Sequence, residues 1–543
     1  MHLSKRSIPG ILTLALTFAG TLLLSGLFLR PFHAYAAGAP YQTATKGIVA
    51  PSTTVDPPDA SATVPRGTRF LHTGNGQFAQ IPATSSQLAG NAGSLLQNFN
   101  GTSSRDSEKT NFGLEFEPPD QGLCAGNGFV VEPVNSAYNI YSTKGNKIAG
   151  PFNVNRLYND GFKQFTSDPR CFYDKTTNAW FAVILFISSN NKVGRIDLSV
   201  NPTGDPTSHW TTYKIDVTDL GGPGCPCFGD QPTLGIDQYN VYVSTNEFSI
   251  LGPQFNGAQI YAFSKSELVA LSQSVHYVHF GNLNIGGTKA ASVQPAISFG
   301  EPNAEYFLNS LDPNGTFDNR VGVWAMTNRQ AVGKGGIPNL SSIVITSEPY
   351  GIPPAAQQKG SKQTLDSGDD RMQQVQYLNG DLWGELTTAV TIPGDNAERA
   401  GAAWFEVNPH LNGNKIGSAT LLNQGYVALK GSNLIYPAVQ ASPQGTAAIV
   451  MTLSGKDFYP SAVYTVLQAG HTSFGPIHIA AAGTGPYVYK PHQSRWGDYS
   501  WAILAPDGNS FWMATEYVPP KSSQTSDGKN NWGTRVLEVS ASQ

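Results

Sequence analysis

Charge is scarce in this chain, and neither sign of charge prevails. Of its 543 residues, 13% are charged, and the formal net charge is only −4. That share is about half of the usual one. Proteins that track nucleic-acid phosphates carry a basic excess, so the composition argues against a nucleic-acid partner.

Familiar catalytic motifs and long helical patterns are also missing. The sequence has no G-x-S-x-G, no H-E-x-x-H, no P-loop and no G-x-G-x-x-G after a strand. The best helical candidate is one short segment, 265–274. Gly (57 residues) and Pro (37) are instead plentiful, which is typical of many short strands joined by turns. The composition favours an all-β fold.

A short pattern recurs seven times between residue 120 and the C-terminus. Each copy has a polar opening, an apolar strand-like run, a tight turn and a second apolar run. The spacing of the copies ranges from 48 residues (120 to 168) to 75 residues (294 to 369). A β pattern repeated at this period indicates a propeller or a solenoid. The copies begin at Asp120, Asp168, Asp230, Gln294, Asp369, Tyr436 and Arg495.

The second copy shows what one unit contains. It predicts four strands, at 168–174, 180–187, 193–200 and 209–217, and four antiparallel strands make one propeller blade. The last copy ends after its third strand, whereas 94–99 is a spare strand before the first copy. An open ring would leave unpaired strand edges. We therefore predict an all-β, seven-bladed β-propeller over 93–543, with four-stranded antiparallel blades and a ring closed by the N-terminal strand.

The N-terminal region has the features of an export signal. Lys5 and Arg6 precede an apolar run over 11–29, and the small-x-small triplet A-Y-A ends at Ala36. We expect cleavage after Ala36, which makes 1–36 a signal peptide and the protein extracellular. The alternative is an uncleaved membrane anchor, because the apolar run is nearly long enough to span a bilayer. Residues 37–92 are rich in Ala, Thr, Ser and Pro and predict a flexible linker.

The four cysteines are expected to form two disulfides, as is usual in exported proteins. Cys225 and Cys227 are two residues apart, so an extended strand would put both side chains on one face, with a Cα separation near the upper limit for a disulfide. Cys124 and Cys171 lie on equivalent strands of consecutive copies, and the alternative is that these two are free and buried. Further Cys or His at ligand spacing is missing nearby, so no metal site is expected.

The repeat predicts a ring of polar side chains around one mouth of the central channel. The opening residue of each first strand would lie there, and the second strands would run back to the same face. Paired carboxylates can divide acid and base work, and arginine binds carboxylates bidentately. The catalytic candidates are Glu247, Asp370, Arg371, Arg495, Asp498 and Glu516. The ligand-binding candidates are Asp120, Asp168, Arg170, Asp230, Gln231, Gln294, Tyr436 and Trp496.

A structural interpretation of the ring competes with this functional one. An Asp repeated in most copies suits a repeated hydrogen bond to the adjoining backbone, whereas a catalytic residue has no reason to recur in five blades. The arginines would then neutralise the ring. No cofactor is expected. Structural Ca²⁺ is an option for the acidic loops 312–319 and 365–370, although neither has the EF-hand spacing.

Five segments together resemble a known group of proteins. They are PPDQGLCAGNGFVVEPVNSAYNIY from Pro118, SDPRCFYDKTTNAWF from Ser167, CFGDQPTLGIDQYNVYVSTNEF from Cys227, DDRMQQVQYLNGDLW from Asp369 and RWGDYSWAILAPDGNSFWMATEY from Arg495. This set is similar to large secreted bacterial proteins described as sialidase-like or BNR-type β-propellers. The resemblance spans about Phe99 to the C-terminus and implies a propeller and export. The group has no settled activity, so the resemblance lends no catalytic residues. The chain also departs from true sialidases, because it has seven repeats where they have six and its Asp boxes are degenerate.

Two functional hypotheses remain. The first is a secreted, monomeric, non-catalytic platform that binds a glycan or a protein at the channel mouth. The second is an extracellular carbohydrate-active enzyme, a sialidase-like glycoside hydrolase or a polysaccharide lyase, that uses the carboxylates and arginines of the mouth.

Overall fold

Short apolar runs between Gly-, Asn- and Asp-containing turns form strands throughout the chain. The computed structural model describes residues 43–52, 81–89, 95–113, 116–311, 317–488, 494–526, 528 and 531–542. All of them belong to one unit, Ala37–Gln543. The expected signal peptide, 1–36, lies outside the described residues.

Sets of four consecutive antiparallel strands recur along the described chain. The first sheet contains β3 (Cys124–Gly126), β4 (Phe129–Val134), β5 (Ala137–Ser142) and β6 (Lys147–Asn153). The second contains β7 (Phe165–Asp174), β8 (Ala179–Ile187), β9 (Gly194–Asn201) and β10 (Thr211–Asp216). A later sheet contains β25 (Ser432–Ala441), β26 (Ala447–Gly455), β27 (Ser461–Leu467) and β28 (His478–Ala481). The strands predicted for the second copy lie within three residues of those observed.

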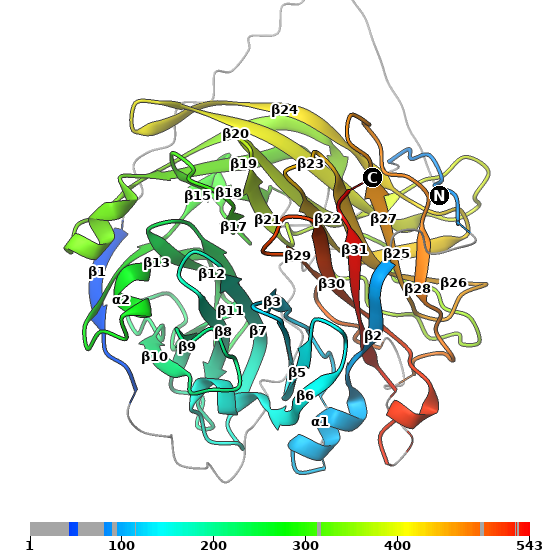
Figure 1. The fold of residues 1–543 in the computed structure, drawn as a ribbon. Helices are drawn as coiled ribbons and strands as arrows, with labels where there is room; N and C mark the ends of the chain where they lie inside the picture. The colour runs from blue at the N-terminus through cyan, green and yellow to red at the C-terminus, as the bar shows by residue number, and fades with distance from the viewer. Residues whose placement is uncertain are drawn as a thin grey trace, which may run out of the picture. The chain divides into compact units, whose positions relative to one another are not determined.

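Three further sets merge into one sheet of 13 strands. They are β11 (Cys227–Ile236), β12 (Asn240–Ser249), β13 (Phe255–Ser264) and β14 (Val275–Gly281); β17 (Gln294–Ser298), β18 (Glu305–Ser310), β19 (Asp318–Thr327) and β20 (Asn339–Tyr350); and β21 (Val375–Leu378), β22 (Asp381–Val390), β23 (Arg399–Asn412) and β24 (Lys415–Val427). The sets join where their first strands pair in parallel, β11 with β17 and β17 with β21. Figure 1 shows first strands such as β3, β11 and β17 toward the middle of the unit, with β6, β24 and β28 toward its outside.

The last sheet is built from both ends of the described chain. It contains β29 (Trp501–Leu504), β30 (Ser510–Tyr517), β31 (Gly533–Ser540) and β2 (Leu95–Ser103). β2 pairs antiparallel with β31, with Asn98 opposite Leu537. The predicted pairing of the spare N-terminal strand with the last set is therefore present.

The segment 37–92 differs from a flexible linker in two places. Residues Thr43–Val49 form strand β1, which pairs with β14 along seven residues, from Thr43 opposite Gly281 to Val49 opposite Val275. β14 would otherwise be an edge strand with unpaired backbone groups, which can pair with another chain. The pairing with β1 removes this exposed edge. Farther along, isolated bridges join Pro82 to Thr391 and Leu88 to Ile477.

Helices are few and short in the described part of the chain. They are α1 (Ser104–Thr110), α2 (Lys265–Val269) and the 3₁₀ turns η1 (Val154–Tyr158), η2 (Arg329–Lys334) and η3 (Lys521–Ser523). α1 begins with a capping box, in which Ser103 and Asp106 each bond the other's backbone N–H. α2 occupies the first half of the predicted segment 265–274. None of these helices has the length and apolar character that crossing a bilayer requires.

Left-handed backbone marks the openings of several first strands. Asp120, Asp168, Gln231 and Tyr436 have φ between 44° and 61°, which is uncommon for residues other than glycine. The strand register shifts at three of these openings, next to Asp168, Gln231 and Tyr436. Bulges of this kind re-aim side chains and are frequent beside functional sites. Here they turn the opening residues toward a common cavity.

Candidate functional site

The residues that begin the first strands of six units line one cavity, which has a volume of about 170 Å³. Long-range hydrogen bonds hold them together: the backbone N–H of Asp498 donates to Asp120 Oδ1 at 2.7 Å, although the residues are 378 positions apart. The cavity is lined by eight of the residues predicted from the sequence, which are Asp120, Asp168, Asp230, Gln231, Arg371, Tyr436, Arg495 and Asp498.

The carboxyl groups of Asp120 and Asp168 tie neighbouring openings together. Besides the bond from Asp498, Asp120 accepts a bond from Asn135 Nδ2 at 2.8 Å. Asp168 Oδ2 accepts the backbone N–H of Gln231 at 3.1 Å, and Asp168 N–H donates to Asn135 Oδ1 at 2.7 Å. These are the repeated backbone contacts that the structural interpretation of the ring predicts.

Burial also changes the acidity of these two groups. It raises the pKa of Asp120 well above the ordinary value, and the negative charge of Asp498 adds to the effect. The pKa of Asp168 is raised for the same two reasons in the same order, while its bond from Ser167 opposes the shift. Both carboxyl groups therefore keep a proton to higher pH than an exposed Asp does.

Both arginines that line the cavity are already engaged by carboxylates. Arg371 forms an ion pair with Asp369 at 2.5 Å and donates a second bond to Gln231 Oε1. Arg495 pairs with Asp498 at 2.5 Å and lies 3.6 Å from Asp366. An acidic ligand would have to displace one of these partners. The predicted neutralising role of the arginines agrees with this arrangement.

One side of the cavity is apolar. Phe165 begins β7, Leu185 and Ile187 end β8, and Phe228 lies near the start of β11. Together with Phe116 they form an apolar wall within the cavity lining. Sequence reasoning missed this wall, although a signal was available. Phe116, Phe165 and Phe228 precede the openings Asp120, Asp168 and Asp230 by four, three and two residues.

Several predicted site residues lie outside the cavity lining. Arg170 is fully buried, with its guanidinium carbon 3.0 Å from the centre of the Tyr499 ring. Gln294 donates to the carbonyl of Met372 at 2.9 Å, and Trp496 donates to Thr452 Oγ1 at 3.2 Å. Asp370 and Glu516 are also buried and do not line the cavity. These residues point into the packed interior of the unit.

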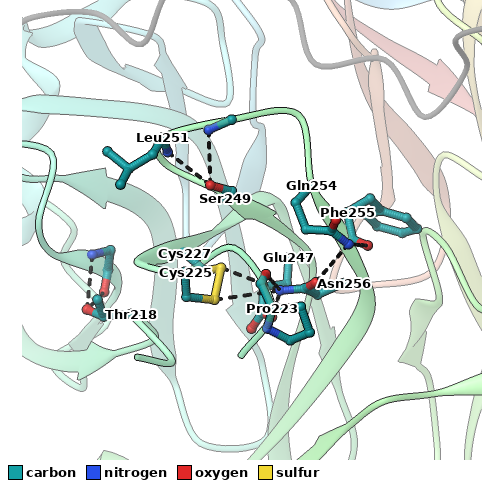
Figure 2. The surroundings of a disulfide bond; sticks show 12 residues. Thr218, Pro223, Cys225, Cys227, Glu247, Ser249, Leu251, Gln254, Phe255 and Asn256 are labelled. Atoms are coloured by element: carbon teal, nitrogen blue, oxygen red, sulfur yellow. Dashed lines mark hydrogen bonds between the residues drawn. A yellow bond between two sulfur atoms is a disulfide. The ribbon is translucent and has the colours of Figure 1, made fainter. Parts of the chain in front are cut away.

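Glu247 is the clearest departure from the predicted position. It was expected at the channel mouth because it lies near the end of a second strand, yet it contacts the Cys225–Cys227 disulfide instead (Figure 2). Successive residues of a strand point to opposite faces. Its neighbour Asn246 bonds Ser292 at 2.8 Å, and Glu247 therefore points the other way.

Both predicted disulfides are present. Cys124 on β3 is bonded to Cys171 on β7, and this bond links two successive units. Cys225 is bonded to Cys227, with a Cα separation of 4.5 Å. The expected separation near the upper limit is wrong, because Cys225 precedes β11 in a turn, with its N–H bonded to the carbonyl of Gly222.

Metal ligands are not assembled at the cavity. Within the described residues, a single group of three potential ligands lies close together, namely Cys225, Cys227 and Glu247. Its two sulfur atoms are bonded to each other, so they are not thiolate ligands. The described loop 365–370 forms no such group, and the other Ca²⁺ candidate, 312–319, lies mostly outside the described residues.

Comparison with known proteins finds distant likeness in structure and none in sequence. No protein-family model and no curated protein matches this chain. A GH93 α-L-arabinofuranosidase of Fusarium graminearum aligns with 81% of this chain and 97% of its own at 10% identity and a TM-score of 0.36. An α-L-arabinanase of Penicillium chrysogenum covers 81% and 98% at 8% identity, with a TM-score of 0.33. The hemagglutinin-neuraminidase ectodomain of parainfluenza virus 5 covers 83% and 91% at 9% identity, with a TM-score of 0.35. The resemblance to BNR-type proteins stays a prediction, and the argument for function rests on the cavity.

Proposed function

We propose that the cavity binds one sugar residue of an extracellular glycan. The observation that carries this proposal is the pairing of an aromatic wall with a ring of charged and amide groups inside about 170 Å³. A sugar ring presents C–H groups on its face and hydroxyls at its rim, so it needs both kinds of surface. Pockets for drug-sized ligands measure roughly 300–1,000 Å³, and the smaller volume here suits a single ring.

The charges favour a neutral sugar over an acidic one. The lining contains more acidic side chains than arginines, and both arginines are ion-paired with Asp369 and Asp498. A ligand carboxylate would meet this acidic surface and gain no unpaired guanidinium. Sugar hydroxyls can instead donate to the Asp oxygens and accept from arginine and amide groups.

The same proposal includes the architecture and the location of the protein. We infer that the seven four-stranded sets are blades of one β-propeller and that the β2–β31 pairing closes its ring. The shared cavity of openings from six units supports a radial arrangement. Export is supported by the two disulfides, because such bonds persist in oxidising compartments. We expect the exported protein to be a monomer.

A binding screen tests the glycan proposal directly. Purified protein is titrated with neutral and acidic oligosaccharides by calorimetry, and binding of a neutral one is expected. Phe165→Ala removes part of the apolar wall and should weaken binding about fivefold, since an aromatic contact is worth about 1 kcal/mol. Phe162→Ala is the matched control, because Phe162 is exposed and lies outside the cavity lining. Unchanged affinity in F165A, or a strict preference for acidic sugars, contradicts the proposal.

Hydrolysis of the glycan is the second candidate function. One cavity holds Asp120, whose pKa is raised, and Asp498, which is ion-paired with Arg495. Two carboxyl groups in one cavity can divide the acid and base roles of glycoside hydrolysis. If the protein is a hydrolase, Asp498→Asn should lower the release of reducing sugar at least 100-fold while leaving sugar affinity within about tenfold. Binding without any release of reducing sugar by the native protein would leave the non-catalytic platform as the function.

A further inference from the structure

The Cys225–Cys227 disulfide lies beside the polar side chains of Glu247 and Asn256, and its cysteines do not line the cavity (Figure 2). One carboxylate oxygen of Glu247 and both sulfur atoms lie within 4.8 Å of one another. Asn256 Nδ2 donates to Glu247 Oε1 at 2.9 Å and lies 3.6 Å and 3.5 Å from the sulfurs of Cys225 and Cys227. A carboxyl group and an amide N–H therefore both face this disulfide.

A purely structural role explains this bond poorly. Its two cysteines are only two positions apart in the chain, and the stabilisation from a disulfide grows with the length of the loop that it closes. The bond also fixes a segment that hydrogen bonds already hold, because Cys227 N–H bonds the carbonyl of Thr218 at 2.8 Å. Something other than chain restriction must account for the buried carboxyl group at its side.

The two cysteines differ in exposure. Cys225 is half-buried and follows the exposed residues Pro223 and Gly224, whereas Cys227 is fully buried on β11. An incoming thiolate can therefore reach Cys225 more easily than Cys227. Thiol–disulfide exchange depends on which sulfur is attacked and on access to it. The asymmetry assigns Cys225 as the attacked sulfur and Cys227 as the leaving group.

Glu247 is placed to supply the proton that the leaving sulfur needs. Its side chain is only 4% exposed, and burial raises its pKa to about 7, with Asn256 and Lys289 opposing and Asp219 adding to the shift. The buried Tyr261 of β13 is a further titratable group that interacts electrostatically with Glu247. At neutral pH a substantial fraction of Glu247 therefore carries a proton next to the two sulfurs.

We propose that Cys225–Cys227 is a reactive disulfide that oxidises a pair of thiols on a second exported protein. A partner thiolate attacks Cys225 Sγ, a mixed disulfide forms, and the electron pair of the broken bond moves to Cys227 Sγ. Glu247 gives its proton to that sulfur. The second partner thiolate then attacks the partner sulfur of the mixed disulfide and releases Cys225 as a thiolate. This chain gains two electrons, the partner gains a disulfide, and the two protons lost by the partner thiols return to Cys225 and, through Glu247, to Cys227.

The surface around Cys225 suits a polypeptide partner. Leu220 and Leu251 have the most exposed large apolar side chains of the described residues, at 78% and 70%. Leu220 lies in the loop that leads to Cys225, and Leu251 follows Ile250, whose N–H bonds the carbonyl of Pro226 at 2.8 Å. An extended cysteine-containing segment with apolar neighbours would cover them.

The test begins with the native protein and a synthetic peptide that carries two cysteines between leucines. The products are alkylated and identified by mass spectrometry. We expect one peptide disulfide per chain, with Cys225 and Cys227 alkylated and Cys124–Cys171 intact. A peptide that stays reduced, or reduction of Cys225–Cys227 only in denaturant, overturns the proposal.

Variants then test the assigned roles. In Cys227→Ala the remaining Cys225 should react with an aromatic disulfide reagent at least tenfold faster than Cys227 does in Cys225→Ala. Glu247→Gln should slow the exchange at least tenfold at pH 7. The native rate per partner thiolate should fall as pH rises through about 7, because Glu247 loses its proton there. Equal reactivity of the two cysteines, or a Glu247→Gln rate and pH profile like those of the native protein, refutes the mechanism. Sugar binding at the cavity should be unchanged in all three variants, which separates failure of this proposal from failure of the glycan proposal.

Discussion

The two disulfides of this protein contrast in what they connect. Cys124–Cys171 joins the first strands of two successive units and is buried, and its cysteines are 47 positions apart in the chain. Cys225–Cys227 stays within one short turn, and its first cysteine is half-buried at the surface. A bond between units restricts the unfolded chain, whereas a bond within a turn restricts little. We therefore expect the first disulfide to stabilise the fold and the second to take part in the proposed thiol–disulfide exchange.

Strands β1 and β2 also differ in what their pairing contributes to the fold. Deleting β2 is expected to have the largest effect on folding of all the changes predicted below. β2 completes the last unit by pairing with β31, whereas β1 only covers the outer edge of β14. Deletion of 95–103 should abolish cooperative folding, because it leaves β31 as an open edge and removes a link between distant parts of the chain. Deletion of 43–49 should leave a folded protein with a slightly lower melting temperature. Circular dichroism and thermal melts measure both, and equal damage from the two deletions would refute this contrast.

The disulfides themselves give the next largest effect. Replacing Cys124 and Cys171 by Ala should lower the free energy of unfolding by about 4 kcal/mol, the chain-entropy value for a loop of this length. Replacing Cys225 and Cys227 by Ala should lower it by only about 1.5 kcal/mol by the same relation. Denaturant titration of the two double variants gives the numbers. If the second pair costs as much as the first, Cys225–Cys227 is a structural bond.

Glu247, which lies beside the Cys225–Cys227 disulfide, should make the free energy of unfolding depend on pH. Its pKa rises from 4.5 to about 7 on folding, so the folded state binds the proton more tightly than the unfolded state. The stabilisation is complete below pH 4.5 and is lost as pH rises through about 7. A shift of this size corresponds to at most about 3 kcal/mol between pH 4 and 8. Glu247→Gln should flatten this dependence in denaturant titrations, and an unchanged slope would show that other groups cause it.

Much of the fold could be predicted because the chain repeats itself. The strands predicted from 168 to 217 correspond to β7 to β10, and the spare strand at 94–99 lies within β2. Strand β1 was missed because TATKGIV lies in a Thr- and Pro-rich region, and its order comes from the exposed edge of β14 rather than from its own pattern. Long-range pairing of this kind leaves no local signal in a sequence.

The site was predictable only in part, for a related reason. The opening residues of six of the seven copies do meet at one cavity, whereas Gln294 does not line it. Three of the six, Asp120, Asp168 and Tyr436, have left-handed backbone. The side-chain direction after a bulge could not be predicted. Arg170 follows a register shift and points into the protein interior. Glu247 points toward the disulfide because it lies on the opposite face of β12 from Asn246. Local register decides which face a residue occupies.

The pairing of β2 with β31 also bears on how the chain matures. Asn98 and Leu537 face each other across more than four hundred intervening residues, so the earlier strand is synthesised long before its partner exists. Until then the backbone N–H and C=O groups of β2 that bond β31 have no partner there, and they can pair with another strand. The last sheet can therefore be completed only after β31 has been synthesised.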